Sequence, residues 1–118
     1  MSRQTRAEEV NDLFERALPV IHSTLEGYYR LSQREARDAE HDLFVWFHRF
    51  ARRIGNAQTP VHSMRLSLLL AACQYGRSLQ LWKQEGASTD EGLARALERE
   101  PRELASELVA RLDGESGR

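Results

Sequence analysis

The chain has 118 residues, of which 41% are hydrophobic and 30% are charged, and its formal net charge is −1. This length suits one domain with a single core, and the composition is that of a soluble globular protein. No apolar run reaches the roughly 18 residues that a membrane span needs. The first residues do not resemble a secretory signal, and the lone Cys73 cannot form an internal disulfide. We therefore expect one cytoplasmic domain with no membrane segment.

The small net charge hides an uneven distribution along the chain. Residues 31–86 contain eight Lys or Arg against five Asp or Glu, whereas residues 87–118 contain five against eight. No acidic residue lies between Leu43 and Gln84, although this segment contains six basic and six aromatic residues. A basic segment rich in aromatic residues favours an anionic partner, with nucleic acid as the first candidate.

The first predicted helix covers residues 7–31. Its apolar residues recur at intervals of three and four, which places them on one helix face. They are Val10, Leu13, Phe14, Ala17, Ile21, Leu25 and Tyr28. Pro19 lies inside this pattern, where proline removes a backbone hydrogen bond and clashes with the preceding turn. We therefore expect a kink, or two short helices that meet near Leu18.

The second predicted helix covers residues 34–54, and Gly55 is expected to end it in a left-handed conformation. The residues on its apolar face are Ala39, Leu43, Trp46, Phe47, Phe50 and Ile54. Phe44 and Val45 lie beside that face and widen it. We expect the C-terminal segment to cover them through Leu93, Leu97, Leu104 and Leu108. The alternative is that they stay exposed for a protein partner or a homodimer.

A loop over residues 55–59 precedes the third predicted helix, with Thr59 as its cap and Pro60 as its first residue. This helix should end near Gly86. Residues 66–73 are apolar on nearly every side. We therefore expect the third helix to be the central element, packed between other helices.

The C-terminal segment reads as two short helices or one bent helix. Residues 88–91 match a capping box, Pro101 is expected to restart the helix, and Gly114 to end it. The fold class that we predict is all-α. It is a compact bundle of three main helices over residues 1–86, with an acidic helical extension over residues 87–118 packed on it.

The sequence argues against catalysis because its reactive side chains do not converge. The four histidines have no partner at metal-ligand spacing, and one cysteine is too few for the usual zinc sites. These histidines are His22, His41, His48 and His62. The acidic residues Asp38, Glu40 and Asp42 suit the positive end of a helix dipole. We therefore expect neither an enzyme nor a metal or other cofactor.

The seven glycines are scattered and form no phosphate-binding loop. Gly27 and Gly76 lie inside predicted helices, where each glycine costs about 1 kcal/mol relative to alanine. Close packing against a neighbouring element is the expected reason for both.

Residues 37–53 resemble region 2 of the sigma-70 family of bacterial RNA polymerase sigma factors, especially its extracytoplasmic-function branch. The agreement with the pattern of that family covers Asp38, Ala39, Glu40, Phe47, Arg49, Phe50, Arg52 and Arg53. The leucine-rich stretch over residues 68–83 is similar in character to the DNA-facing helix of the family. Two features depart from the pattern. Phe44 and Val45 replace a polar Gln-Glu pair, and we expect the chain to lack the second DNA-binding domain of the family.

The resemblance implies that the second helix docks on the polymerase clamp and that the third helix binds unstacked promoter bases. The residues that it assigns to the polymerase-facing helix are Asp38, Glu40, Arg49, Arg52 and Arg53. Phe44 and Val45 depart from the family pattern, and we expect them to contact a protein partner if they are exposed. On the DNA-facing helix, cations would meet phosphates and rings would stack on bases. The residues that it assigns to nucleic acid are Arg65, Gln74, Tyr75, Arg77, Trp82 and Lys83.

Two functions follow as expectations. The first is a sigma-like transcription regulator domain that binds promoter DNA, in single-stranded form, with core RNA polymerase as a further candidate partner. It requires Arg52, Arg53, Arg77 and Lys83 to share one continuous face. The second is a degenerate sigma-like protein-interaction module, which forms a homodimer or binds another regulator and does not bind DNA. In that case the acidic tail could mask the basic helix.

Overall fold

The computed structural model describes residues 3–53, 61–86 and 99–116. These residues form helices α1 (Arg3–Ser23), α2 (Gln33–Arg53), α3 (Val61–Glu85) and α5 (Arg99–Ser116), and the single π-helical turn η1 (Thr24–Tyr28). The described residues contain no strand, so the predicted all-α class is confirmed. The predicted loop with Gly55, Thr59 and Pro60, the predicted capping box at residues 88–91, and the side chain of His62 lie outside the description.

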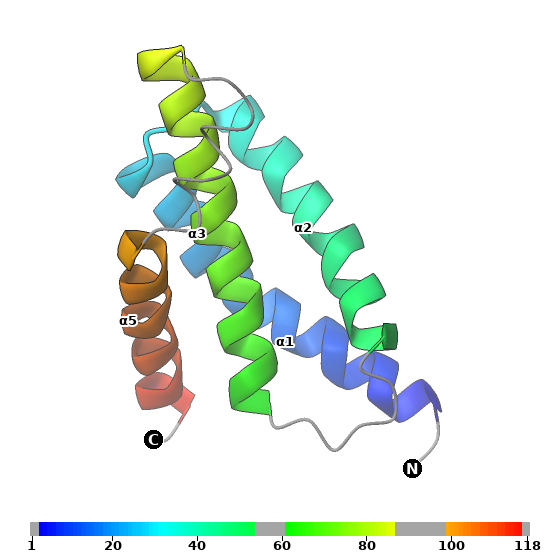
Figure 1. The fold of residues 1–118 in the computed structure, drawn as a ribbon. Helices are drawn as coiled ribbons and strands as arrows, with labels where there is room; N and C mark the ends of the chain where they lie inside the picture. Colours follow the sequence, from blue (N-terminus) through cyan, green and yellow to red (C-terminus); the bar gives the residue numbers. More distant parts are fainter. Residues whose placement is uncertain (1–2, 54–60, 87–98, 117–118) are drawn as a thin grey trace.

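Helix α3 is the central element of the bundle. It packs against α1, α2 and α5, with α2 and α5 on opposite sides of it (Figure 1). The prediction that the third helix lies between other helices is therefore confirmed. Each of α2 and α5 runs antiparallel to α3.

One apolar core is shared by these elements, and α5 contributes to it as well as the three longer helices. The members of this core from α5 are Ala105, Leu108, Val109 and Leu112. From α3 they are Met64, Leu68, Leu69, Ala72 and Cys73, and from α2 they are Ala36, Ala39, Leu43, Phe47 and Ala51. The three-and-four spacing of apolar residues therefore identified most of the buried face of α1 and, in α2, the buried residues Ala39, Leu43 and Phe47.

Helix α1 continues unbroken through Pro19, so the predicted alternative of two short helices meeting near Leu18 is wrong. Pro19 is exposed, and on a solvent-facing side water can bind the carbonyl that proline leaves without a donor. The irregularity comes later, at η1. There the Tyr29 N–H donates to the carbonyl of Thr24 at 3.0 Å, which is a π-type bond.

A π-helical turn holds one residue more than an α-helical turn, so it shifts the inward-facing register by one position. Tyr29 is consequently buried, with 1% of its surface exposed, whereas Tyr28 is 52% exposed. The prediction that Tyr28 lies on the core face is therefore wrong by one residue. Arg30 follows with φ of 58°, in the left-handed region, and this residue ends the first helical segment.

Helix α2 begins with a capping box that positions its first turn. The Ser32 N–H donates to Glu35 Oε1 at 2.9 Å, and the Glu35 N–H donates to Ser32 Oγ at 3.1 Å. At the end of α3, Gly86 has φ of 63° and stops the helix as predicted.

The expectation for the two helical glycines is half confirmed. A Cβ on Gly76 would collide with the Tyr29 ring, whereas one on Gly27 would meet nothing within 4 Å.

In α5, Pro101 lies in the first turn, where a helix needs no N–H donor. The same helix continues past Gly114 to Ser116, so the predicted end at Gly114 is too early.

Candidate functional site

Helix α2 forms one edge of the bundle and presents apolar side chains to solvent. Phe44, Val45 and Trp46 are 42%, 37% and 39% exposed. The expectation that the C-terminal segment covers Phe44 and Val45 is not met by the described part of that segment. Helix α5 packs mainly against α3 on the side away from α2, and Leu108 is buried there (Figure 1). Leu93 and Leu97 lie outside the described residues.

These three consecutive residues wrap around the outer side of α2, because successive positions turn by about 100° around a helix. Phe44 lies on the α1 flank, where its ring meets that of Phe14 edge-on at a centroid distance of 5.3 Å. Trp46 lies on the other flank and stacks on Phe50 at 5.2 Å. Val45 lies between them. Trp46 was predicted to belong to the core, and its position at the margin of the apolar face explains why spacing alone misassigned it.

Three arginines follow in the next two turns of α2. Arg49, Arg52 and Arg53 are exposed, and over the described residues none of them forms an ion pair. Positive charge in the last turn also suits the negative end of the helix dipole. We define the α2 surface as Phe44, Val45, Trp46, Arg49, Arg52 and Arg53. It joins aromatic rings to guanidinium groups that are available to a partner.

Asp38 and Glu40, the two acidic residues assigned to the polymerase, differ in where their side chains lie. Asp38 is exposed on the outer side of α2. Glu40 instead faces the bundle, where its Oε1 is 2.7 Å from Nδ1 of His22. The Nε2 atom of His22 is 2.5 Å from Glu26 of η1. Glu40 therefore joins α2 to the end of α1 and does not belong to the α2 surface.

The three cations assigned to nucleic acid on α3 are each paired with an acidic residue elsewhere in the chain. Arg65 is buried and pairs with Asp113 of α5. The Nε atom of Arg77 lies 4.0 Å from Glu100 of α5. These acidic partners were not identified from the sequence, because they lie far from α3 along the chain.

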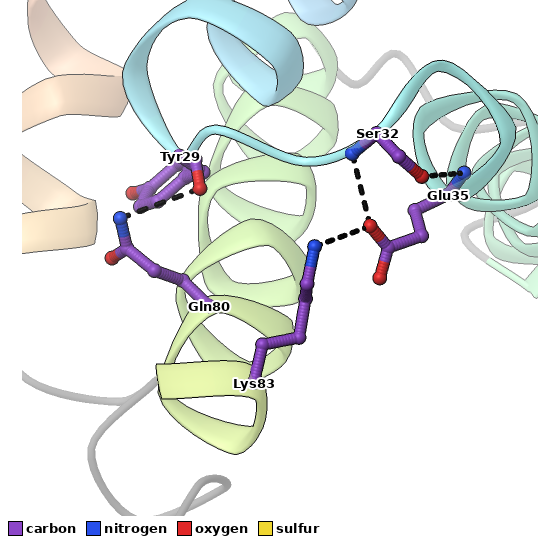
Figure 2. A network of polar contacts seen from close by, with 5 residues as sticks. All are labelled: Tyr29, Ser32, Glu35, Gln80 and Lys83. Carbon is purple, nitrogen blue, oxygen red and sulfur yellow. Dashed lines mark hydrogen bonds and ion pairs between the residues drawn. The ribbon is translucent and has the colours of Figure 1, made fainter. Parts of the chain in front are cut away.

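The third cation, Lys83, pairs with the N-terminal turn of α2. Its Nζ donates to Glu35 Oε1 at 2.7 Å, and the same oxygen accepts from the Ser32 N–H (Figure 2). The Lys83 and Ser32 bonds to the carboxylate hold the pKa of Glu35 at about 2. Lys83 therefore helps to fix the start of α2 on α3.

The remaining residues assigned to nucleic acid differ in exposure. Gln74 and Tyr75 are half-buried, and the Tyr75 hydroxyl donates to Asp42 Oδ2 at 2.9 Å. Burial and the bond to Asp42 raise the pKa of Tyr75 to about 12. Trp82 is 60% exposed. Trp82 and Lys83 are thus the members of the predicted set that reach the surface.

Arg52 and Arg53 of α2 lie toward the opposite end of the bundle from Arg77 and Lys83 of α3. Because α2 and α3 run antiparallel, Glu35 meets Lys83 at one end and Asp42 meets Tyr75 in the middle. Arg52, ten residues beyond Asp42, is about 15 Å further along the axis. Arg52 and Arg53 therefore do not form one continuous face with the cations at the end of α3.

Comparison with known proteins gives no relative for this chain: no family model, curated protein or solved structure matches it. In the portion of the chain that the structure describes, no three His, Cys, Asp or Glu side chains are grouped so that they could hold a metal ion. Over the same portion, every helix is too short or too polar to cross a membrane.

Proposed function

We propose that this chain is a non-enzymatic binding module that docks a protein partner through the α2 surface. The observation that carries the proposal is the exposure of Phe44, Val45 and Trp46 on a helix whose other side is core. Aromatic residues and arginine are the residue types enriched at the energetic centres of protein interfaces. Here both types occur within ten residues of one helix.

The resemblance to sigma region 2 suggests which partner to test first. In that family the helix that aligns with α2 docks on the clamp of RNA polymerase. Phe44 and Val45 replace hydrogen-bonding groups there with apolar ones, so the contact made by this chain would be more apolar than in the family. Core RNA polymerase is therefore the first candidate partner, as part of a transcription regulator.

The test compares two variants that introduce the same aspartate on exposed helix positions. Val45→Asp changes the centre of the α2 surface, and Ala110→Asp changes the exposed side of α5. We expect Val45→Asp to weaken binding to purified core polymerase at least tenfold, as is typical of a residue at an interface centre. Ala110→Asp should bind like the unmodified chain. Equal affinity of both variants would exclude the α2 surface, and no binding by the unmodified chain would exclude polymerase.

Single-stranded nucleic acid is the second candidate ligand. The observation in its favour is that Arg49, Arg52 and Arg53 have no ion pair in the described residues, while Trp46 on the same surface is exposed. The pairing of Arg77 and Lys83 with acidic residues weighs against α3 as the binding helix.

A fluorescence titration with single-stranded DNA tests this second candidate. Binding to phosphates must weaken steeply as salt increases, and it must fall when Arg52 and Arg53 are both changed to Glu. Charge reversal at Arg77 or Lys83 is a poor probe, because it would also break contacts within the fold. Affinity that does not depend on salt, or that survives the double reversal, would remove nucleic acid as a ligand of this surface.

A further inference from the structure

We propose that α2 also binds a second copy of this chain, in a two-fold symmetric dimer whose two α2 helices cross antiparallel at Val45. This dimer would use the same α2 surface as the proposed function, so a second copy and another protein would compete for it. The charges on either side of Val45 select this arrangement.

Asp38, Val45 and Arg52 are spaced by seven residues along α2. Seven residues are close to two helical turns, so the three side chains lie on one line along the helix, about 10 Å apart. All three are exposed. Within the described residues neither Asp38 nor Arg52 forms an ion pair. The outer side of α2 therefore carries a negative charge, an apolar centre and a positive charge at equal intervals.

On the line through Asp38, Val45 and Arg52, a two-fold axis at Val45 places each residue opposite the one that lies equally far on the other side of Val45. Asp38 of one copy then faces Arg52 of the other, and the reverse pair forms by symmetry. A parallel arrangement would instead place Asp38 against Asp38 and Arg52 against Arg52. Like charges in contact are destabilising, so the charge pattern selects the antiparallel dimer. The antiparallel helix dipoles favour the same choice.

The centre of this crossing is apolar. The Val45 side chains of the two copies meet at the axis. On one flank Phe44 lies beside Phe44 of the other copy, and on the other flank Trp46 lies beside Trp46. These side chains are more than a third exposed in one copy, and dimerisation would remove part of that surface from water. A contact built on one helix per copy belongs to the small class of interfaces, so association is expected at micromolar rather than nanomolar concentrations.

Two charge reversals test the dimer by sedimentation equilibrium on the full chain. Asp38→Arg places two positive charges opposite each other, and Arg52→Asp places two negative charges opposite each other. We expect each variant alone to associate at least tenfold more weakly than the unmodified chain. An equimolar mixture of the two should associate again, because one variant then carries arginine and the other aspartate at both sites. The chain with both reversals should also recover.

Val45→Asp should abolish self-association, whereas Ala110→Asp should leave it unchanged. Positions 38 and 52 are exposed, and an unchanged circular dichroism spectrum would show that the variants are folded. The proposal expects association at micromolar concentrations. An unmodified chain that is still monomeric at about 100 micromolar would therefore overturn it. So would single variants that associate normally, or a mixture that stays monomeric.

The outcomes also separate this inference from the proposed function. A monomeric chain that binds core polymerase, with binding lost in Val45→Asp, removes the dimer and keeps the proposed function. A dimer that follows the charge reversals, in a chain that binds no polymerase, keeps the dimer and removes that partner.

Discussion

Tyr29, which follows η1, lies so close to Gly76 of α3 that there is no room for a methyl group on Gly76. A Cβ on Gly76 would be 2.5 Å from Cδ2 and 2.9 Å from Cγ of the Tyr29 ring. The ring is buried, and the carbonyl of Tyr29 accepts a bond of 3.3 Å from Gln80 of α3 (Figure 2). This contact fixes the end of the first helical segment on the central helix.

We predict that Gly76→Ala lowers the free energy of unfolding by about 1–3 kcal/mol, because overpacking forces the ring or the backbone to move. Gly27→Ala is the matched control, since a Cβ there meets nothing within 4 Å. It should be neutral or stabilising by up to about 1 kcal/mol. Urea denaturation of both variants measures the difference. If Gly76→Ala were as stable as Gly27→Ala, the close approach would be wrong.

At Arg30 we predict a substitution that stabilises the fold, in contrast to Gly76→Ala. Its φ of 58° lies in a region that costs a non-glycine residue about 1–2 kcal/mol. Arg30→Gly should therefore raise the free energy of unfolding by up to about 1 kcal/mol, after the larger entropy loss of glycine is deducted. Arg37→Gly, on the exposed side of α2, should lower it by about 1 kcal/mol. Thermal unfolding of the two variants compares them, and a destabilised Arg30→Gly would contradict the left-handed assignment.

The sequence predicts the helices well because a helix face is a local property. Apolar spacing is enough to place Leu43 and Phe47 in the core, and a glycine is enough to place the end of α3 at Gly86. The π-helical turn was not predictable in this way. Its extra residue makes Tyr29 the buried ring in place of Tyr28. No spacing rule marks where a π-helical turn occurs. The capping box was predictable, since Ser32 and Glu35 have the required spacing.

The candidate site was less predictable because ion pairs depend on which helices become neighbours. The stretch without acidic residues from Leu43 to Gln84 suggested a free basic face. In the fold, Arg65 and Arg77 find carboxylates on α5, and Lys83 finds one at the start of α2. Charge along the sequence therefore says little about charge on a surface. The exposure of Phe44 and Val45 could be stated only as an alternative, since it depends on where α5 packs.

The burial of α5 predicts what happens when the C-terminal segment is removed. Ala105, Leu108, Val109 and Leu112 belong to the common core, so deletion of residues 87–118 should expose the α3 face beneath them and abolish cooperative unfolding. Leu108→Ala should lower the free energy of unfolding by about 2–4 kcal/mol. A truncated chain that unfolds cooperatively and binds DNA more tightly would instead favour a detachable acidic mask. Circular dichroism during a urea titration distinguishes these results.

The contact between Glu35 and Lys83 predicts a pH dependence of stability. The pKa of Glu35 is about 2 in the folded chain, compared with an ordinary value of 4.5. Because folding lowers this pKa, the charged carboxylate stabilises the fold above pH 4.5, and the contribution is lost as the pH falls from 4.5 towards 2. Glu35→Gln removes the charge but keeps a side chain that suits the capping box.

We therefore expect Glu35→Gln to be less stable than the unmodified chain by about 1 kcal/mol near neutral pH. This difference should shrink through the same acid range and vanish near the lower pKa, because the unmodified chain then also carries an uncharged group. Glu107→Gln, at an exposed position of α5, is the control and should show no such difference. Urea titrations at a series of pH values measure both. A Glu35→Gln difference that stays constant down to the most acidic point would mean that the Lys83 contact does not stabilise the fold through charge.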